Sequence, residues 1–226
     1  MPADRLPTGI DSVDRLLGGG LETDCLTEIY GEGGSAKTLF CLEVALRVAR
    51  ADRWVFYVDT EGVSVDRLRA MAGDGLEAIL HRFLLSAPKD LDEQRRSVAT
   101  ACQLARDGKR PVGLIVVDSG TYFYRLSLSA PDEDEARQAL SLSVADLAAT
   151  AFRAGIPVLL TNQVWRSVRE GTLEPLGGSF LNHAAKTILR FDRRPGDRRR
   201  VVLMKHRSLP EGAAEFRITA SGLVSA

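Results

Sequence analysis

The stretch Gly31-Glu32-Gly33-Gly34-Ser35-Ala36-Lys37-Thr38 decides the fold of this chain. It follows the apolar run Leu26–Tyr30 and precedes a segment, starting at Leu39, in which apolar residues recur with the period of a helix. A strand, a glycine-rich turn and a helix are therefore expected in this order. Seven of the eight positions fit the pattern G-x-x-x-x-G-K-[ST], and Ala36 stands where the pattern has its second glycine.

A turn of this composition is typical of phosphate binding. Its successive backbone N–H groups point inward and cradle anions, and the positive end of the following helix faces the same site. We expect the Lys37 ammonium to reach the outer phosphates of a nucleotide and the Thr38 hydroxyl to ligate Mg2+. A turn that only starts a helix is the alternative, which the Lys-Thr pair disfavours. The predicted nucleotide-binding residues are Gly31, Glu32, Gly33, Gly34, Ser35, Ala36, Lys37, Thr38 and Leu39.

Length and composition indicate one globular domain. The chain has 226 residues, of which 45% are hydrophobic and 27% charged. It contains no apolar run of about 18 residues and no signal-peptide core, so we expect no membrane partner. Its three cysteines are scattered without pairing or metal-ligand spacing, which favours a reducing cytoplasm.

Charge is unevenly distributed along the chain. The formal net charge is zero, which argues against a generic nucleic-acid binder. From residue 160 to the end, however, there are 12 lysines and arginines against 6 acidic residues, and six arginines fall between Arg190 and Arg200. The Arg193–Arg200 segment is either a solvated turn between two strands or a surface that binds anions or a partner.

Apolar runs alternate with helical patterns over most of the chain. This alternation predicts an α/β fold, in which a mostly parallel sheet is flanked by helices. Three β-like runs near the C-terminus predict antiparallel strands added at one edge of that sheet. We expect loops over Ser119–Pro131 and Gln163–Ser179. The predicted strands are Leu26–Tyr30, Trp54–Val58, Phe83–Leu85, Val112–Val117, Val158–Leu160, Thr187–Phe191, Val201–Met204 and Glu215–Thr219, and the main predicted helices are Lys37–Arg50, Leu91–Arg106 and Asp132–Ala154.

Three polar residues follow predicted strands and complete a candidate ATPase site. Asp118 ends an apolar strand and is placed to hold Mg2+, since ligands bind at the carboxyl ends of parallel strands. Glu61 follows another strand and is placed to orient water at the γ-phosphate. Gln163 follows a third and is placed to sense that phosphate. The alternatives are a capping aspartate, a solvated glutamate in a turn and a structural amide pair.

The order of motifs resembles the core of a RecA-family recombinase. The matching segments, in chain order, are Thr8-Gly-Ile-Asp11, Asp14-Arg-Leu-Leu-Gly-Gly-Gly20, Glu28–Glu32, Asp59-Thr-Glu-Gly62, Val117-Asp-Ser119 with Tyr124-Arg125, Thr161-Asn-Gln-Val164, Leu176-Gly-Gly-Ser179 and His183. They span about residues 5–224. The resemblance implies a RecA-like ATPase core that uses ATP and Mg2+, contacts DNA and acts in homologous recombination and repair.

The resemblance also assigns roles residue by residue. Lys37, Gln163 and Glu61 would act in ATP hydrolysis, with Gln163 coupling nucleotide state to the following loop, while Thr38 and Asp118 would hold the metal. Two loops would face DNA, Tyr122–Pro131 through Arg125, and Val164–Gly178 through Arg166 and Arg169. The residues expected to reach a neighbouring subunit's nucleotide are His183, Lys205 and Arg207.

The N-terminus departs from filament-forming members of that family. Those members carry a DNA-binding domain or an aromatic docking motif ahead of the core. We therefore expect residues 1–226 to form one core domain, with residues 1–10 as a short lead and without an N-terminal DNA-binding domain. A homo-oligomer remains open, whereas a self-assembled filament is not expected. The expected partners are a recombinase or another repair protein, and single-stranded DNA bound weakly, with strong salt dependence and no sequence preference.

Ala36 is the second departure from the pattern of the family, and it bears on whether the protein hydrolyses ATP. A methyl group there would crowd the β-phosphate, and a positive φ would add strain of about 1–3 kcal/mol. We therefore expect an accessory protein that binds ATP and hydrolyses it slowly. The alternatives are a nucleotide-gated scaffold without catalysis and a regulatory ATPase like KaiC, against which Asp59-Thr-Glu61 and Thr161-Asn-Gln163 favour recombinase kinship.

Overall fold

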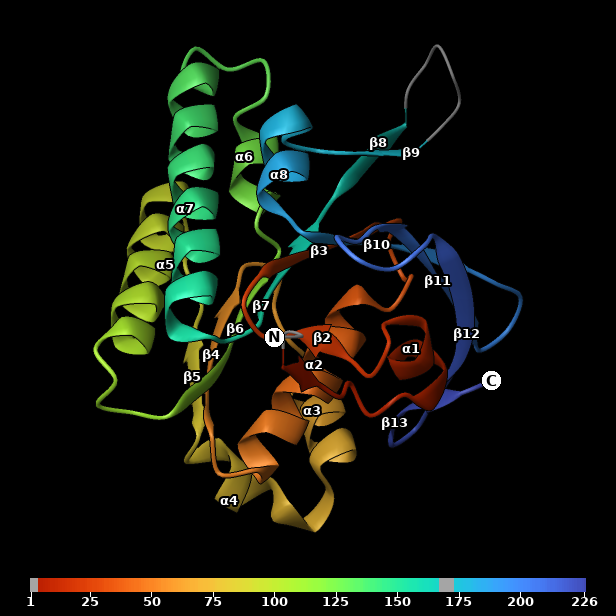
Figure 1. The fold of residues 1–226 in the computed structure, drawn as a ribbon. Coiled ribbons are helices and arrows are strands. Elements are labelled where there is room, and N and C mark those ends of the chain that lie inside the picture. The colour runs from red at the N-terminus through yellow and green to blue at the C-terminus, as the bar shows by residue number, and fades with distance from the viewer. Residues whose placement is uncertain (1–3, 167–172) are drawn as a thin grey trace.

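A nine-stranded sheet organises the part of the chain that the computed structural model describes, residues 4–166 and 173–226. The strand order across the sheet is β13-β12-β11-β10-β3-β7-β6-β4-β5 (Figure 1). In that order the strands are Gly222–Ser225, Gly212–Thr219, Arg198–Lys205, Thr187–Arg193, Leu26–Gly31, Val158–Asn162, Val112–Asp118, Trp54–Asp59 and Phe83–Ser86. The six strands from β10 to β5 pair in parallel, and β11, β12 and β13 add antiparallel strands. The α/β prediction is confirmed.

Continuous apolar runs form the central strands because both faces of the sheet are covered. All residues of β3, β6 and β7 are buried, as expected for parallel strands between two helical layers. One face packs against α2 (Lys37–Arg50), α3 (Val65–Ala72) and α4 (Leu76–Leu80), and the other against α5 (Leu91–Arg106) and α7 (Glu133–Ala154), as Figure 1 shows. The short α1 (Asp11–Leu16) lies beside β12 and β13.

The two predicted loops carry regular structure that the sequence pattern did not indicate. The first contains α6 (Tyr122–Leu126), a single short helix whose Tyr124 is buried against the α7 side of the sheet. The second contains the antiparallel pair β8 (Val164–Arg166) and β9 (Leu173–Pro175), and ends in α8 (Gly178–Ala184). The expectation of irregular loops was therefore wrong at both places. A further small pair joins β1 (Arg5–Leu6) to β2 (Leu21–Glu22).

Parallel pairing brings the carboxyl ends of four strands to one edge. β3 pairs with β7, β7 with β6 and β6 with β4, so the residues that follow each strand meet at the same end of the sheet. The register aligns Asp59 at the end of β4 with Asp118 at the end of β6. Among the described residues, no helix is both long and apolar enough to cross a membrane.

Candidate nucleotide-binding site

The phosphate loop connects β3 to α2 at this edge. Its first residue, Gly31, pairs with Phe191 of β10, and a Cβ on Gly31 would lie 2.2 Å from the Phe191 carbonyl oxygen. A side chain cannot fit in that space, so glycine is required where β10 passes the start of the loop. The loop then turns directly into α2, whose first residues are Lys37 and Thr38.

Ala36 adopts a left-handed backbone conformation, with φ 79° and ψ 23°. An L-amino acid with a Cβ pays roughly 1–2 kcal/mol for this conformation relative to the right-handed region. Strain was expected at Ala36 if its φ angle were positive, and the φ angle is positive. The methyl group is buried among the apolar residues under α2, so packing offsets part of that strain.

Lys37 is held inside the curve of the loop. Its ammonium donates hydrogen bonds to the carbonyl oxygens of Gly31, at 2.7 Å, and Glu32, at 3.1 Å. Burial lowers the pKa of Lys37, while the carboxylates of Glu61 and Asp118 oppose that change. The ammonium therefore lies among groups that favour its charged form, next to the turn that would hold phosphates.

Asp118 lies below the loop and is nearly fully buried. Its carboxylate accepts hydrogen bonds from the Tyr57 hydroxyl at 2.7 Å, from the Thr161 hydroxyl at 2.6 Å and from the side chain of Thr38. Burial raises the pKa of Asp118, and these three donors act in the opposite direction. The structure thus brings together the two residues predicted as metal ligands, Thr38 and Asp118. Tyr57 and Thr161 were not predicted as site residues, because both belong to strands, β4 and β7, and carry no motif of their own.

Glu61 is presented by a turn that Asp59 organises. The buried Asp59 carboxylate accepts the backbone N–H groups of Glu61, Gly62 and Val63 at distances of 3.2, 2.8 and 2.6 Å. Thr60 ties the same turn to the end of β6, since its hydroxyl oxygen accepts the N–H of Ser119 at 2.9 Å. The Glu61 side chain therefore projects from a fixed turn into the cavity beside Lys37 and Asp118.

A line of polar contacts leads from Glu61 to the first predicted DNA-facing loop. The Gln163 side-chain amide donates to Glu61 Oε1 at 2.7 Å, and its oxygen accepts a hydrogen bond from Arg125 at 3.2 Å. Glu61, Gln163 and Arg125 lie far apart in sequence and belong to three different connections. The structure therefore brings the predicted water-orienting residue, the predicted sensor and one predicted DNA-binding residue into direct contact.

A buried polar cluster lies beside Gln163 and was not predicted. Asn162 donates to Glu28 Oε1 at 2.7 Å and to the Leu176 carbonyl at 2.7 Å, and its side-chain oxygen accepts the Thr121 hydroxyl at 2.8 Å. The Gln163 backbone N–H in turn donates to the Thr121 hydroxyl oxygen at 3.0 Å. One side chain thus anchors the start of the first predicted DNA-facing loop, through Thr121, and the end of the second, through Leu176. Glu28, which pairs with no cation at hydrogen-bond distance among the described residues, has a pKa raised to about 7 by burial.

A cavity of about 370 Å3 opens at the phosphate loop. It is lined by Gly33, Gly34, Ser35, Ala36, Lys37, Thr38, Leu39, Glu61, Asp118, Arg199 and Ile218. Seven of these belong to the nine residues predicted to bind the nucleotide. The other two, Gly31 and Glu32, lie at the base of the loop, where their carbonyl oxygens accept hydrogen bonds from the Lys37 ammonium. Arg199 was not predicted at this place.

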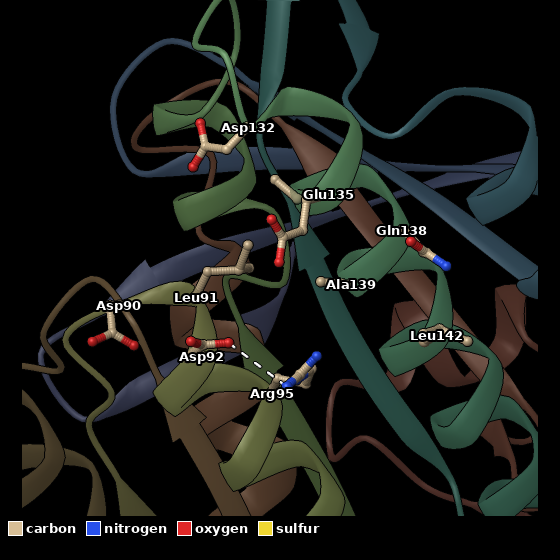
Figure 2. Close-up of a pocket in the computed structure, with 10 residues that line it drawn as sticks. Asp90, Leu91, Asp92, Arg95, Asp132, Glu135, Gln138, Ala139 and Leu142 are labelled. Carbon is tan, nitrogen blue, oxygen red and sulfur yellow. Dashed lines mark ion pairs between the residues drawn. The ribbon is translucent and has the colours of Figure 1, made fainter.

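A second cavity of similar size, about 400 Å3, lies between α5 and α7, away from the loop. Figure 2 shows the carboxylates of Asp90, Asp92, Asp132 and Glu135 around it, with Arg95 paired to Asp92. Four carboxylates against one guanidinium repel an anion. We therefore place the candidate nucleotide site at the phosphate loop.

The remaining predicted residues lie away from the loop. His183 is exposed on α8, and the Lys205 ammonium donates to the carbonyls of Asn182 and Ala185 at the end of that helix, at 2.6 and 2.9 Å. Arg207 forms ion pairs with the buried Glu22, at 3.0 Å, and with Asp24.

Two of the predicted DNA-binding arginines fall on the second loop. Arg166 ends β8, and Arg169 lies outside the described residues. Their prediction therefore stays as the sequence made it.

The donor set fits a nucleotide with Mg2+. A turn with a left-handed residue followed by a helix start is the geometry that presents N–H groups to an anion. The buried Ser35 hydroxyl has no hydrogen-bond partner among the described residues. Thr38 and Asp118 offer two oxygen ligands, which are too few to coordinate a metal ion without other ligands. No cluster of three or more His, Cys, Asp or Glu suited to a metal occurs in residues 4–166 and 173–226. This is the arrangement that Mg2+ uses when phosphate oxygens complete its shell.

Comparisons with known proteins agree with this geometry. The Rad51 family model matches residues 4–226. The DNA repair and recombination protein RadB of Methanoculleus marisnigri is 41% identical over 99% of both chains, and its namesake in Thermoplasma acidophilum is 39% identical over 97% of this chain and 93% of its own length. The crystal structure of the RadB recombinase superposes with a TM-score of 0.81 at 37% identity, covering 98% of this chain and 99% of that one. The chain therefore belongs to the Rad51 family, with RadB proteins as its relatives over nearly its whole length.

Proposed function

We propose that this protein is an accessory factor of DNA repair and homologous recombination that binds ATP with Mg2+ and hydrolyses it slowly. The observation that carries the proposal is the unbroken contact from Glu61 through Gln163 to Arg125. It connects the predicted γ-phosphate position to a loop predicted to face DNA. A nucleotide site without that connection would equally suit a simple kinase or transporter ATPase.

The chain's own residues suit the chemistry of phosphoryl transfer. Bound Mg2+ would neutralise phosphate charge, and Thr38 and Asp118 would hold it. Lys37 would move its ammonium from the loop carbonyls to the outer phosphate oxygens, a short displacement because it already lies inside the loop. Glu61, fixed by the Asp59 turn, would orient the attacking water.

Slow turnover follows from the position of Ala36. Its methyl group occupies the turn where the pattern of phosphate loops has glycine, and its left-handed conformation is already strained. About 1.4 kcal/mol lost equally in the bound state and the transition state weakens binding tenfold and lowers kcat/KM by the same factor. Each further 1.4 kcal/mol or so lost only in the transition state, where the phosphate charge is redistributed, slows turnover of bound ATP about tenfold.

DNA contact is proposed for the two loops anchored by Asn162. Arg125 belongs to the first, and Arg166 and Arg169 to the second. A few arginines give phosphate contacts without base readout, so binding to single-stranded DNA should be weak, non-specific and strongly salt-dependent.

The setting and partners of the protein are proposed by the same reasoning. A recombinase or another repair protein is the proposed protein partner. His183, Lys205 and Arg207 would face the nucleotide of a neighbouring subunit if the chain forms a homo-oligomer. The three cysteines are free and buried, which suits a reducing cytoplasm.

The test combines binding and turnover on the full chain. ATP with Mg2+ is titrated calorimetrically, hydrolysis is measured with and without single-stranded DNA, and Glu61→Gln serves as the matched variant. We expect measurable ATP binding in both proteins and slow hydrolysis only in the wild type. Hydrolysis that survives Glu61→Gln contradicts the role of Glu61. Fluorescence anisotropy of labelled single-stranded DNA at low salt tests the DNA contact, and no binding with or without ATP contradicts it.

A nucleotide-gated scaffold is the second candidate, and Ala36 is the observation that favours it. The scaffold binds ATP as described but does not turn it over. Measurable wild-type hydrolysis that Glu61→Gln abolishes rejects this candidate, whereas binding without hydrolysis in either protein supports it.

A further inference from the structure

The hairpin between β10 and β11 lies over the phosphate loop. Arg199 on β11 pairs with Arg193 on β10, and both approach Gly34 in the middle of the loop. Arg199 Nε donates to the Gly34 carbonyl at 2.9 Å, and a Cβ on Gly34 would lie 3.9 Å from the Arg193 side chain. Close packing of Phe191 against Gly31 fixes this approach. Part of the arginine-rich turn is therefore a wall of the nucleotide cavity.

The Arg199 guanidinium is oriented by its own hairpin. Its Nη1 donates to the carbonyls of Gly196 and Arg198 at 3.1 and 2.7 Å. Together with the bond to Gly34, these contacts hold the planar group at the cavity that also contains Lys37 and Thr38. A guanidinium that is already oriented loses little entropy when it binds phosphate.

The charge of Arg199 is not neutralised within the part of the chain that the structure describes. Two arginines nearby in the sheet have carboxylate partners, Arg198 with Glu215 at 3.8 Å and Arg217 with Asp197 at 2.8 Å. Arg193, Arg194 and Arg200 resemble Arg199 in forming no ion pair among the described residues. Arg199 bonds only to carbonyl oxygens, which leave its positive charge in place. The charged residues that line the cavity are Lys37, Arg199, Glu61 and Asp118. Arg199 has no anionic partner among them, so a bound anion would supply one.

We propose that Arg199 is a nucleotide-binding residue that supplies a second cation, beside Lys37, to the phosphate chain of a nucleoside triphosphate or diphosphate. This inference rests on the proposed function, because it concerns the same cavity. It adds a residue from outside the loop motif. A guanidinium forms charge-assisted hydrogen bonds to phosphate oxygens, which are about twice as strong as neutral ones. The alternative role is structural, in which Arg199 only holds the Gly34 carbonyl.

Two conservative substitutions separate charge from structure. Arg199→Gln keeps a donor for the Gly34 carbonyl but removes the charge, whereas Arg199→Lys keeps the charge but loses the planar fork. Arg198→Gln is the matched control, because it removes one positive charge from the adjacent residue, whose side chain faces Glu215 instead of the cavity. Each protein is titrated with ATP and ADP, with Mg2+, at low and at high salt.

We expect Arg199→Gln to weaken ATP and ADP binding about tenfold at low salt, with a smaller loss at high salt. Arg199→Lys should remain within about threefold of the wild type, and Arg198→Gln within about twofold. If Arg199→Gln binds ATP as tightly as the wild type, or if the Gln and Lys variants lose equally, the inference is overturned. A wild type that binds neither nucleotide overturns the proposed function and this inference together, so the two failures give different results.

Discussion

The buried carboxyl group of Glu28 makes the stability of the fold depend on pH. Only 1% of Glu28 is exposed, and burial raises its pKa from 4.5 to about 7, although the Asn162 amide and the Lys205 charge oppose the shift. The folded state therefore holds the Glu28 proton more tightly than the unfolded state does. Folding loses stability as pH rises from 4.5 to about 7, and the loss is complete above the folded pKa.

The size of the effect follows from that shift. It corresponds to about 3 kcal/mol in full, of which about 2.5 kcal/mol should be lost between pH 5 and pH 8. Glu28→Gln removes the titration and keeps an oxygen that can accept the Asn162 amide. We therefore expect this variant to be about as stable as the wild type near pH 5, and about 2–3 kcal/mol more stable at pH 8.

Urea unfolding at pH 5, 6, 7 and 8 measures this difference directly. Glu77→Gln serves as the control, because Glu77 is exposed on α4 and its substitution should leave the pH profile parallel to that of the wild type. If the wild-type and Glu28→Gln profiles are also parallel from pH 5 to pH 8, the carboxyl is not held neutral by burial, and the reasoning is refuted.

Three further outcomes are expected. Ala36→Gly should change the free energy of unfolding by less than about 1 kcal/mol, because relief of left-handed strain is offset by the greater freedom of glycine in the unfolded chain. Calorimetry should nevertheless show up to about tenfold tighter ATP binding. An unchanged Kd would contradict the idea that the methyl group crowds the phosphate. Gln163→Ala should leave ATP affinity within about twofold of the wild type but remove any stimulation of hydrolysis by single-stranded DNA, because the contact to Glu61 is lost. Stimulation that persists in a coupled ATPase assay would show that this contact is dispensable. Arg207→Ala should lower the free energy of unfolding by about 2 kcal/mol, measured with urea, because it takes an ion-pair partner from the buried Glu22. A stability equal to that of the wild type would mean that the other neighbours of that carboxylate, Arg5 and His206, satisfy it.

The central part of the fold could be predicted because the sequence there obeys local rules. The phosphate-loop pattern and the apolar runs of β3, β4 and β6 have the length and composition that buried parallel strands require. Other elements owe their form to tertiary contacts. β13 is a four-residue segment that becomes a strand by pairing with β12, and the five residues of α6 are helical where Tyr124 packs into the core.

The candidate site divides in the same way. Asp118 ends a strand, Glu61 follows one, and Lys37 and Thr38 begin the helix after the phosphate loop, so their meeting at one sheet edge could be foreseen. The position of Arg199 could not, because it depends on how closely β10 passes Gly31 and on the turn that returns β11 over the loop.

Strand geometry gives the end of β7 two separate tasks. Successive side chains of a strand point to opposite faces, so the last two residues of β7, Thr161 and Asn162, point to opposite sides. Gln163 follows directly after the strand, and its contact to Glu61 lies on the side of Thr161. On the first side the Thr161 hydroxyl binds Asp118 and the Gln163 amide binds Glu61, and both partners line the cavity at the phosphate loop. On the other side Asn162 holds the connections that follow β6 and β7. A shift of this strand end therefore changes both sides at once, because one stretch of backbone carries all three side chains. The alternation of side chains at this strand end therefore connects the proposed phosphate sensor, Gln163, with the placement of both loops.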